Sequence, residues 1–481
     1  MIKTNVNEYK LGSDILKAIS MLNFEEFTEV QKQVIPLILS QKDVVVKSQT
    51  GSGKTAAFAI PICELVDWEE NKPQVLVLTP TRELAIQVKE DIFNIGRFKR
   101  LKVAAIYGKS PFYNQEKELK QKTHVVVGTP GRIIDHLERG TFNTLMIKYL
   151  VIDEADEMLN MGFVEQIETI IGSLPKERVT ILMSATMPSD IEKLCNKYMK
   201  EPIQIEIEDQ NKAATNIYQE RYNVKEQDKI DVLRDITIVE NPDSCMVFCN
   251  TKQKVDEVYI ELAKLMYTCR KIHGGMEQSD RLRVMNDFKR GKFRYLVATD
   301  VAARGIDIDN ITLVVNYDIP EDKESYVHRI GRTGRIGKSG HAITFVTQNE
   351  NRFLTDIERF IGKEIPLKET PSKETVNISK EEFHEKMETS PEIKEEKGAQ
   401  LSIEIMKLHI NAGKKTKMRA VDIVGTLCSI KDMTKDDIGI INILDISTFV
   451  EILNNKGEWV FKELQKTPIK GRVRTVSKAD L

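Results

Sequence analysis

The stretch from Val44 to Ile60, VVVKSQTGSGKTAAFAI, decides the fold. Its three valines are typical of a buried strand. The small polar residues that follow are typical of a tight turn, and the last residues are typical of a helix. Glycines in the turn allow backbone N–H groups to approach a bound anion at the start of that helix. The stretch therefore predicts a parallel α/β sheet with a phosphate site at the carboxyl end of a strand.

The same order of strand, turn and helix recurs along the chain. It is visible in VLVLTPTRELAIQVKEDI, VVVGTPGRIIDHL, YLVIDEADEML and TILMSATMPSDIEKL. After the polar string EDQNKAATN it resumes at CMVFCNTKQKVDEVYIELA, without a second glycine-rich turn. Apolar strands that alternate with helices are typical of parallel sheets covered on both faces. We expect two α/β domains, residues 1–206 and 217–361, joined by a linker at 207–216 and sharing one phosphate site.

Length and composition are those of a soluble protein with about three domains. The 481 residues are 41% apolar and 30% charged, and the net charge is -2. Without a membrane-spanning apolar run or a signal-peptide core, the sequence suggests a cytoplasmic protein. The six cysteines lack metal-site spacing and are expected to be buried. Any affinity for nucleic acid must come from local basic patches.

The C-terminal part of the chain has a polar segment and a patterned segment. Residues 362–403 are rich in Glu, Lys, Ser and Pro, which predicts a flexible charged linker with one short helix near Glu381 to Met387. Residues 404–481 contain apolar runs in the order strand, helix, strand, strand, helix, strand. That order predicts a small α+β domain.

The glycine-rich turn suits the phosphates of a nucleoside triphosphate. Gly51 and Gly53 allow the backbone to approach the phosphates, while Lys54 can neutralise the β and γ charges. Thr55 offers a hydroxyl to Mg²⁺. The alternative is a glycine turn without a ligand.

Clustered acids follow one of the apolar strands, at Tyr149 to Leu159. Asp153 stands where an enzyme with such a phosphate loop needs a carboxylate for Mg²⁺, and Glu154 can polarise the attacking water. The metal charge would make the cluster tolerable. The alternative, a solvated acidic helix start, accounts for Asp156 and Glu157 better than for Asp153.

Three arginines occur at a spacing of three in YVHRIGRTGR, Tyr326 to Arg335. Arginine stabilises the charge that develops on a γ-phosphate during hydrolysis. Because this segment lies in the domain without the glycine-rich turn, hydrolysis would depend on closure of the two domains. The alternative is a solvated basic loop.

Taken together, the motifs resemble those of the DEAD-box RNA helicases. SQTGSGKT, PTRELA, TPGR, DEAD, SAT, ATDVAARGID and HRIGRTGR occur in the order and spacing of that family, over about residues 9–361. The resemblance implies an α/β fold in which two RecA-like domains in tandem close over ATP and single-stranded RNA. It leaves two rival outputs open, an ATP-gated RNA clamp and a DNA motor.

The resemblance also implies a role for many residues at the ATP site. Asn23 and Phe27 differ from the Gly and Pro that the family usually has in its adenine-reading motif. The implied cofactors are ATP and Mg²⁺, with Thr55 and Asp153 as the metal ligands. The implied nucleotide-binding residues are Phe24, Thr28, Gln31, Ser48, Gln49, Thr50, Gly51, Ser52, Gly53, Lys54, Thr55 and, at the ribose, Asp307. The implied residues of hydrolysis and its coupling to unwinding are Lys54, Asp153, Glu154, Ser184, Thr186, His328, Arg332 and Arg335.

The implied RNA contacts of the two domains are mainly to phosphate and sugar, so they do not read sequence. Near them, YGKS at Tyr107 to Ser110 keeps one glycine of a usual pair. The implied RNA-binding residues are Arg82, Thr129, Gly131 and Arg132 in the first domain, and Thr251, Gln278, Arg281 and Thr299 in the second.

Residues 404–481 resemble the ribosomal-RNA-binding domain of the DbpA/YxiN subgroup, an RRM-like module. His409 and Phe449 stand at positions where aromatic residues would stack on bases. A basic turn is expected to contact RNA, with a merely solvated basic face as the alternative; it comprises Lys414, Lys415, Lys417 and Arg419. The resemblance implies a helicase that acts on 23S ribosomal RNA in pre-50S particles during large-subunit assembly. The oligomeric state stays open, with a monomer as the expectation.

Overall fold

The structure is a computed structural model of the chain. It describes residues 9–48, 51–207, 217–303, 311–334, 339–389, 391, 398, 401 and 403–479. It divides into two compact units, which are treated separately below. Unit 1 comprises residues 1–48, 52–206 and 396–481, and unit 2 comprises residues 49–51 and 207–395.

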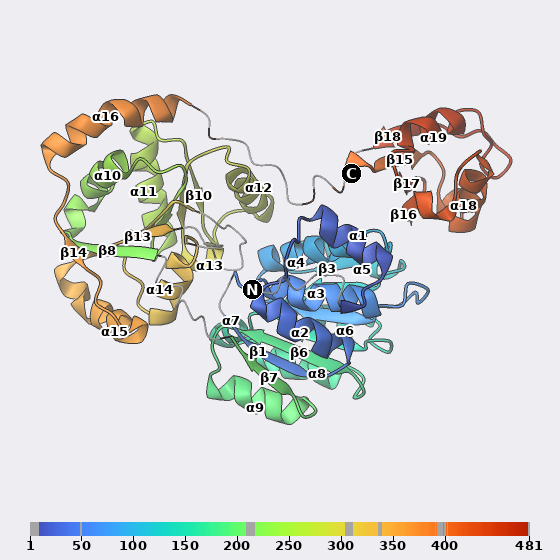
Figure 1. Cartoon of the computed structure of the whole chain (residues 1–481), viewed down its shortest axis with the longest axis horizontal. Coiled ribbons are helices and arrows are strands. Elements are labelled where there is room, and N and C mark those ends of the chain that lie inside the picture. The colour runs from blue at the N-terminus through green and yellow to red at the C-terminus, as the bar shows by residue number, and fades with distance from the viewer. Residues whose placement is uncertain are drawn as a thin grey trace. The chain divides into compact units, whose positions relative to one another are not determined.

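The first α/β domain is built on a seven-stranded parallel sheet with helices on both faces (Figure 1). The strand order is β3-β4-β2-β5-β6-β1-β7. The strands are β1 Val44–Lys47, β2 Val75–Leu78, β3 Val103–Ile106, β4 Val125–Gly128, β5 Tyr149–Ile152, β6 Val179–Ser184 and β7 Ile203–Glu206. The helices are α1 Ser13–Met21, α2 Glu29–Leu39, α3 Lys54–Leu65, α4 Arg82–Ile95, α5 Phe112–Leu119, α6 Pro130–Glu138, α7 Ala155–Asn160, α8 Val164–Gly172 and α9 Ser189–Tyr198.

Burial explains why these short apolar runs form the central strands. Every residue of β2, β4, β5 and β6 is buried, because helices cover both faces of the sheet. The edge strand β7 buries only Ile205. All strand pairs are parallel, so the polar turns that follow the strands meet at one edge of the sheet.

The second α/β domain repeats this architecture in unit 2. Its parallel sheet has the order β10-β11-β9-β12-β13-β8-β14. The strands are β8 Ile217–Asn223, β9 Cys245–Phe248, β10 Cys269–Ile272, β11 Tyr295–Ala298, β12 Leu313–Asn316, β13 Gly340–Val346 and β14 Leu367–Lys368. The helices are α10 Lys229–Glu240, α11 Lys252–Lys264, α12 Gln278–Lys289, α13 Asp300–Ala303, α14 Lys323–Ile330, α15 Asn351–Ile361 and α16 Lys373–Glu388.

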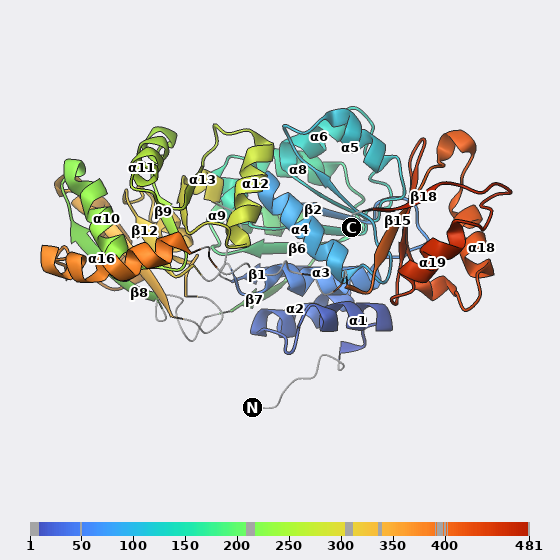
Figure 2. The ribbon, with the colours of Figure 1, turned by 90° about the horizontal axis from the view of Figure 1, so that it is seen from above.

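The C-terminal domain is a four-stranded antiparallel sheet with the order β16-β17-β15-β18. Its elements are β15 Met406–Ile410, α18 Ala420–Ser429, β16 Ile438–Ile443, β17 Thr448–Ile452, α19 Gly457–Leu464 and β18 Val476–Ala479. Both helices lie on the same side of the sheet (Figure 2). Leu408, Val450 and Val460 lie in the core between the sheet and these helices. The predicted α+β domain and its order of elements are confirmed.

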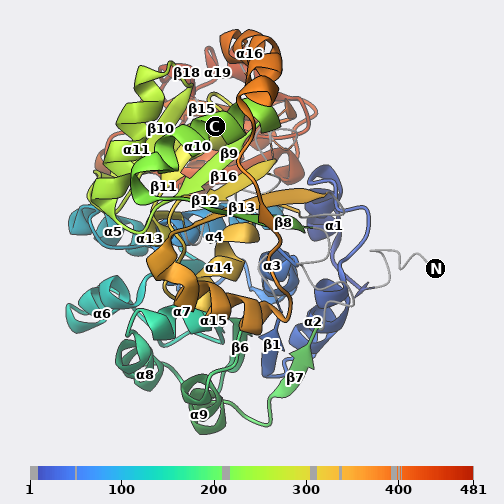
Figure 3. The ribbon, with the colours of Figure 1, turned by 90° about the vertical axis from the view of Figure 1, so that its left-hand side faces the viewer.

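The structure corrects the prediction of a flexible linker over residues 362–403. β14 pairs with β8, and α16 is a helix of 16 residues, much longer than the short helix expected near Glu381 to Met387. Val376 and Phe383 of α16 are buried in the core of the second domain. α16 runs beside α10 (Figures 1 and 3). The first two thirds of the expected linker therefore belong to the second domain.

The cysteines behave as small apolar residues. All six are free thiols; five are buried and Cys428 is half-buried. Burial raises the pKa of the Cys63 thiol to about 12, so this thiol stays protonated. Among the residues that the structure describes, no helix is both long enough and apolar enough to cross a membrane.

Candidate nucleotide and RNA sites

The strand order of the first domain places three motifs next to each other. The glycine-rich turn follows β1, Ser184 ends β6, and Asp153 follows β5. These strands are neighbours in the order β5-β6-β1, and Ser48 N donates to Ser184 O at 2.9 Å. Motifs far apart in the sequence thus meet at one end of the sheet, where open α/β sheets bind ligands.

The glycine-rich turn has the backbone that its sequence predicts. Gly51 and Gly53 have φ angles of 84° and 91°, a region that favours glycine. Lys54 is 7% exposed, and its Nζ donates to Ser48 O at 2.5 Å. The hydroxyls of Ser48 and Ser52 lie 2.8 Å apart. Thr55 follows in the first turn of α3, while Gln49 and Thr50 lie outside the described residues.

Thr28 and Gln31 support the glycine-rich turn directly. The Thr28 hydroxyl donates to Ser52 O at 2.8 Å, and Gln31 Nε2 donates to Gly53 O at 3.2 Å. The two residues also cap α2 reciprocally, since Gln31 Oε1 accepts from Thr28 N at 2.9 Å. The Gln31 amide therefore helps to hold the glycine-rich turn in place.

The departures from the usual adenine-reading motif fit their surroundings. Asn23 has φ 60°, a conformation that asparagine tolerates better than most residues. Phe27 is 2% exposed, and its ring packs edge-on against Tyr9 at 5.0 Å between centroids. Phe24, the expected stacking residue, is half-buried. The substitutions at 23 and 27 preserve the local fold around Gln31.

Asp153 is a buried carboxylate among other acids. It is 3% exposed, and burial together with Glu154 raises its pKa to about 7, against the attraction of Lys54. Glu154 has φ 53°, an uncommon conformation for glutamate, and its N–H donates to Asp153 Oδ1 at 3.1 Å. A bound cation would stabilise the ionised form of Asp153.

Asp156 links the acidic motif to the SAT motif, a connection that sequence reasoning missed. Its Oδ2 accepts from Ala185 N at 3.1 Å, Thr186 N at 2.8 Å and Thr186 Oγ1 at 3.0 Å. Asp156 N donates to Ser184 Oγ at 3.3 Å. Asp156 and Glu157 are each only 4% exposed, so the alternative of a solvated acidic helix start is wrong for both.

The expected RNA contacts of the first domain gather at the other half of the same sheet edge. Arg82 begins α4 after β2, while Thr129 and Gly131 lie at the start of α6 after β4. Arg132 Nη1 donates to Ser110 O at 2.9 Å. A Cβ atom at Gly108 would lie 3.3 Å from Arg82 Nη2, so the glycine that YGKS keeps leaves room for this guanidinium.

The expected RNA contacts of the second domain follow three neighbouring strands. Thr251 caps α11 after β9, Gln278 and Arg281 lie in the first turn of α12 after β10, and Thr299 follows β11. The sheet order β10-β11-β9 places these strand ends side by side. Arg281 is 9% exposed, while the other three are more accessible.

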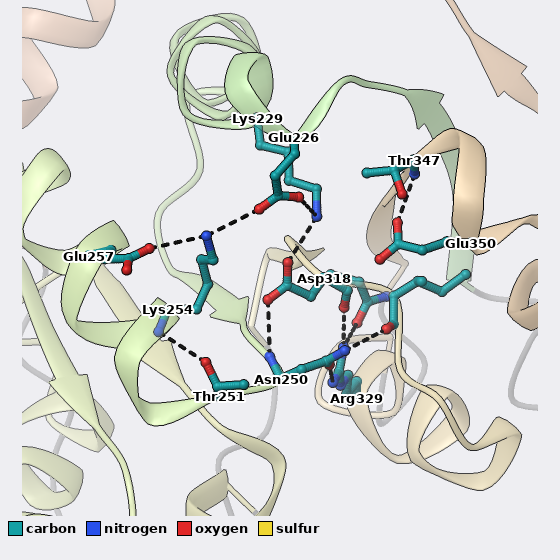
Figure 4. Close-up of polar contacts among 12 residues, drawn as sticks. Glu226, Lys229, Asn250, Thr251, Lys254, Glu257, Asp318, Arg329, Thr347 and Glu350 are labelled. Carbon is teal, nitrogen blue, oxygen red and sulfur yellow. Dashed lines mark hydrogen bonds and ion pairs between the residues drawn. The ribbon is translucent and has the colours of Figure 1, made fainter.

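Arg329, the first arginine of the predicted trio, is structural (Figure 4). It is 1% exposed, and its guanidinium donates to both carboxylate oxygens of Asp300, at 2.5 and 2.6 Å. It also donates to Asn250 Oδ1 at 2.8 Å and to Asp318 O at 2.6 Å. Arg329 thus ties together the ends of β9, β11 and β12.

His328 lies in the last turn of α14, and Arg332 follows the end of that helix. His328 is half-buried, and Arg332, 5% exposed, donates from Nε to His328 O at 3.3 Å. Arg335 and Asp307 lie outside the described residues.

The face of the C-terminal sheet opposite its two helices carries an aromatic pair. His409 and Phe449 are cross-strand partners on β15 and β17, with ring centroids 5.0 Å apart, and both are half-buried. In the basic turn, Lys414 N donates to Leu444 O at 2.8 Å, which joins the turn to the β16–β17 loop. The exposed basic side chains of the turn are those of Lys414, Lys415, Lys417 and Arg419.

Comparison with known proteins decides the family. Residues 28–194 match the DEAD/DEAH box helicase family, and residues 228–337 match the helicase conserved C-terminal domain. A protein of Bacillus subtilis (strain 168) named ATP-dependent RNA helicase DbpA is 57% identical over 477 residues, 99% of this chain and 100% of that protein. The chain belongs to the DEAD-box RNA helicases. It is an ATP-dependent enzyme, and its residues 407–478 match the DbpA RNA binding domain.

Other DEAD-box proteins cover the helicase core. The protein CshA of Geobacillus kaustophilus (strain HTA426) is 47% identical over 369 residues, 77% of this chain and 79% of that protein. The structure of Dbp5 of S. cerevisiae bound to RNA and ADP BeF3 is similar with a TM-score of 0.71 and 32% identity. That similarity covers 79% of this chain and 99% of the Dbp5 chain. The parallel sheets described above are thus the RecA-like domains of a DEAD-box helicase.

Proposed function

We propose that this helicase remodels 23S ribosomal RNA in pre-50S particles and is directed there by its C-terminal domain. The observation that carries the proposal is the combination of a complete helicase core with a separately folded DbpA RNA-binding domain. In this proposal the core supplies ATP-driven strand separation, while residues 404–481 choose the RNA. The enzyme acts as a monomer in the cytoplasm, where bacterial ribosomes are assembled.

Lys54, Thr55 and Asp153 would hold ATP with Mg²⁺. A threonine hydroxyl and a carboxylate offer oxygen ligands of the kind Mg²⁺ prefers. Burial raises the pKa of Asp153, and a nearby cation would lower that pKa again. Bound Mg²⁺ would neutralise charge on the β and γ phosphates. Glu154, next to Asp153, would orient the attacking water. The support of Gly53 by Gln31 would keep the phosphate-binding turn ready for the nucleotide.

Arg332 and Arg335 would stabilise the γ-phosphate charge during hydrolysis, with Asp307 at the ribose. This role requires the two RecA-like domains to close, as the family resemblance implies. Closure would couple hydrolysis to RNA because each domain would contribute part of both the ATP site and the RNA path. Ser184, Thr186 and His328 would transmit this coupling, and the bonds of Asp156 to the SAT segment support the proposal.

The core would grip RNA by its backbone, and the C-terminal domain would supply selectivity. The expected core contacts lie at strand ends and helix starts, which suit phosphate groups. The basic turn would add salt-sensitive phosphate contacts, and the His409–Phe449 pair could stack on unpaired bases.

The proposal is tested with three nucleic acids: a 23S ribosomal RNA fragment, an unrelated RNA and single-stranded DNA. For each, the stimulation of ATPase activity and the binding to the enzyme are measured. Preference for the ribosomal fragment is expected, with DNA the weakest activator. Neutralising the basic turn by replacing Lys414, Lys415, Lys417 and Arg419 with Ala should weaken capture and flatten its salt dependence. A control variant removes the same charge from exposed sites of the same domain, namely Lys431, Lys435, Lys462 and Lys466.

Equal loss in the two variants would show that overall charge, and not the basic turn, attracts RNA. A strand-displacement assay separates the helicase from an ATP-gated clamp. A clamp would bind RNA in an ATP-dependent manner without releasing a short annealed strand. Equal stimulation by ribosomal and unrelated RNA would contradict the proposed target.

A further inference from the structure

The C-terminal domain and the first RecA-like domain share an apolar cluster within unit 1. The first domain contributes Ala18 of α1 and Phe98, which follows α4, and both side chains are buried. Leu401, Ile405 and Leu453 come from the C-terminal part of the chain and are at most 5% exposed. Apolar side chains that leave water in this way stabilise the association of the two domains.

A buried ion pair lies in the same contact. Arg97 Nη2 lies 3.3 Å from Glu451 Oε1, and the two residues are 5% and 6% exposed. The guanidinium also lies over the ring of Phe93, 5.2 Å from its centroid. A buried charge that loses its partner is strongly destabilising, so this pair favours one particular fit of the two surfaces.

Three further cations of the first domain donate to acceptors of the C-terminal domain. One comes from α1, and two come from the segment between α4 and β3. Ammonium and guanidinium groups have only donors, whereas carbonyl and amide oxygens accept, so the two surfaces are complementary. The bonds are Lys17 Nζ to Asn454 Oδ1 at 3.0 Å, Arg100 Nη2 to Lys435 O at 2.7 Å and Lys102 Nζ to Ile441 O at 2.7 Å.

The contact uses the face of the C-terminal sheet opposite its two helices. Val450 and Ile452 of β17 lie in the core of that domain, and side chains alternate along a strand, so Glu451 and Leu453 lie on the opposite face. Gly439 of β16 leaves room for both. A Cβ atom there would lie 2.8 Å from Glu451 Cβ and 3.0 Å from Leu453 Cδ2. The first domain therefore covers the β16–β17 half of this face.

The basic turn of the C-terminal domain lies close to the covered half. Burial, with the charges of Lys122 and Lys414, lowers the pKa of Lys102 to about 8. Lys414 belongs to the basic turn, and its side chain is exposed. His409 and Phe449 on the same sheet face are half-buried. The contact with the first domain thus leaves the basic turn accessible.

We propose that the β16–β17 half of this sheet face is a docking surface for the first RecA-like domain of the same chain. The C-terminal domain is then held on α1 and on the segment after α4. The domain proposed to choose the RNA moves together with the domain that carries the glycine-rich turn. The inference concerns this contact alone and does not require the C-terminal domain to bind ribosomal RNA.

A reversal and a swap of the buried charges in the full chain test the docking surface. Arg97→Glu places a carboxylate beside Glu451, and two like charges in a buried contact repel each other. Arg97→Glu combined with Glu451→Arg restores opposite charges. The matched control is Lys193→Glu, which makes the same change of charge at a side chain of α9 that is 74% exposed.

The distance between two spin labels, measured by pulsed electron paramagnetic resonance, reports the docking. One label is attached to Gln33→Cys in α2 and the other to Ser429→Cys in α18, both at exposed positions. Cys428→Ser removes the half-buried native thiol, while the five other native cysteines are buried and so react poorly with the label.

Wild type and the control are expected to give one narrow distribution of distances. Arg97→Glu should give a broad distribution of longer distances, and the charge swap should restore the narrow one. Identical distributions in wild type and Arg97→Glu, whether narrow or broad, would overturn the inference. A swap that stays broad would also overturn it, because Arg97→Glu would then act on the fold and not on the pair. The labels report position without RNA, so a failure here is distinguishable from a failure of the proposed function.

Discussion

Asp156 shows how a single buried carboxylate can join two motifs. Sequence patterns group it with the acids that follow β5, yet its Oδ2 accepts three hydrogen bonds from Ala185 and Thr186. Two of these bonds come from backbone N–H groups, and one comes from the Thr186 hydroxyl. Movement of the acidic motif must therefore move the segment after β6.

Thr186→Val should separate hydrolysis from unwinding. The substitution removes the hydroxyl bond to Asp156 and keeps the backbone bond, so the ATP site stays assembled. A hydrogen bond to a charged group is worth about 1.5–3 kcal/mol, which is roughly tenfold or more in coupling. Strands separated per ATP hydrolysed, measured with a labelled duplex, should fall by that factor. Thr169→Val, at an exposed position of α8, is the control. An equal loss of ATPase and unwinding in Thr186→Val would refute the coupling role.

Asp153 should make Mg²⁺-nucleotide binding depend on pH. Its pKa is raised from 3.8 to about 7. Below about pH 7 the folded, nucleotide-free enzyme therefore keeps a proton on Asp153, whereas the unfolded chain loses that proton above about pH 4. Folding stability from this group therefore falls as pH rises from about 4 to 7. Because Mg²⁺ favours the ionised form, affinity should rise by up to about tenfold per pH unit below 7 and level off above it.

Titration calorimetry with a Mg²⁺-nucleotide between pH 5.5 and 8.5 measures this dependence. Asp153→Asn should bind weakly and with little pH dependence. If the wild-type affinity is flat across this range, Asp153 is ionised before the metal arrives.

Replacing Arg329 should mainly lower stability, whereas replacing Arg332 should mainly lower turnover. Arg329→Ala removes the partner of Asp300 from the interior, and breaking a buried pair costs about 3–5 kcal/mol, seen as a lower unfolding midpoint. Arg332→Ala, which breaks no bond to a buried carboxylate in the described contacts, should lower that midpoint less and reduce RNA-stimulated turnover by about 10³-fold. The opposite pattern would mean that the structural and catalytic arginines have been exchanged.

At the scale of whole elements, local patterns predicted the sheets well because burial on both faces produces continuous apolar runs. The strands β1, β2 and β5 lie where their valine-rich and leucine-rich runs are. Helix α16 was largely missed because only Val376 and Phe383 mark its buried face. Its other anchors, Tyr267 and Arg294, are remote in the sequence.

The candidate site shows the same limit. The conformation of the glycine-rich turn could be predicted because its glycines, lysine and threonine lie close together in the sequence. The contacts of Gln31 with Gly53 and of Asp156 with Thr186 arise from tertiary packing, which no spacing in the sequence indicates. Arg329 could not be told from Arg332 by spacing, since what distinguishes it is its pair of hydrogen bonds to Asp300.

Gly53→Ala tests how the adenine-reading element supports the phosphate-binding turn. A Cβ atom there would lie 2.5 Å from Gln31 Nε2, and the φ of 91° disfavours alanine by about 1–2 kcal/mol. Nucleotide affinity should fall about tenfold or more, measured by fluorescence titration with a labelled ATP analogue. Gly172→Ala, where a Cβ atom has no neighbour within 4 Å, should bind as wild type. Normal binding by Gly53→Ala would show that Gln31 is not needed for the turn.

On the scale of the whole molecule, the proposed function divides the work between a core that binds RNA of any sequence and a C-terminal domain that selects the RNA. The structure shows where the chain should be cut to separate the core from the C-terminal domain. A cut near residue 375 would sever α16 and remove Phe383, whose ring packs against Tyr267 in the second domain. A core that ends at Thr389 keeps the contacts of Arg294 and so keeps the second domain intact.

The measurement that tests the account most directly compares this core with the full chain. The ATPase rate of each is recorded against the concentration of a 23S ribosomal RNA fragment and of an unrelated RNA of equal length, at one fixed salt concentration. The account predicts that the full chain responds to the ribosomal fragment at a much lower concentration than to the unrelated RNA. It also predicts that the core responds equally to both RNAs, at a high concentration. A core that still prefers the ribosomal fragment would contradict the claim that residues 404–481 select the RNA.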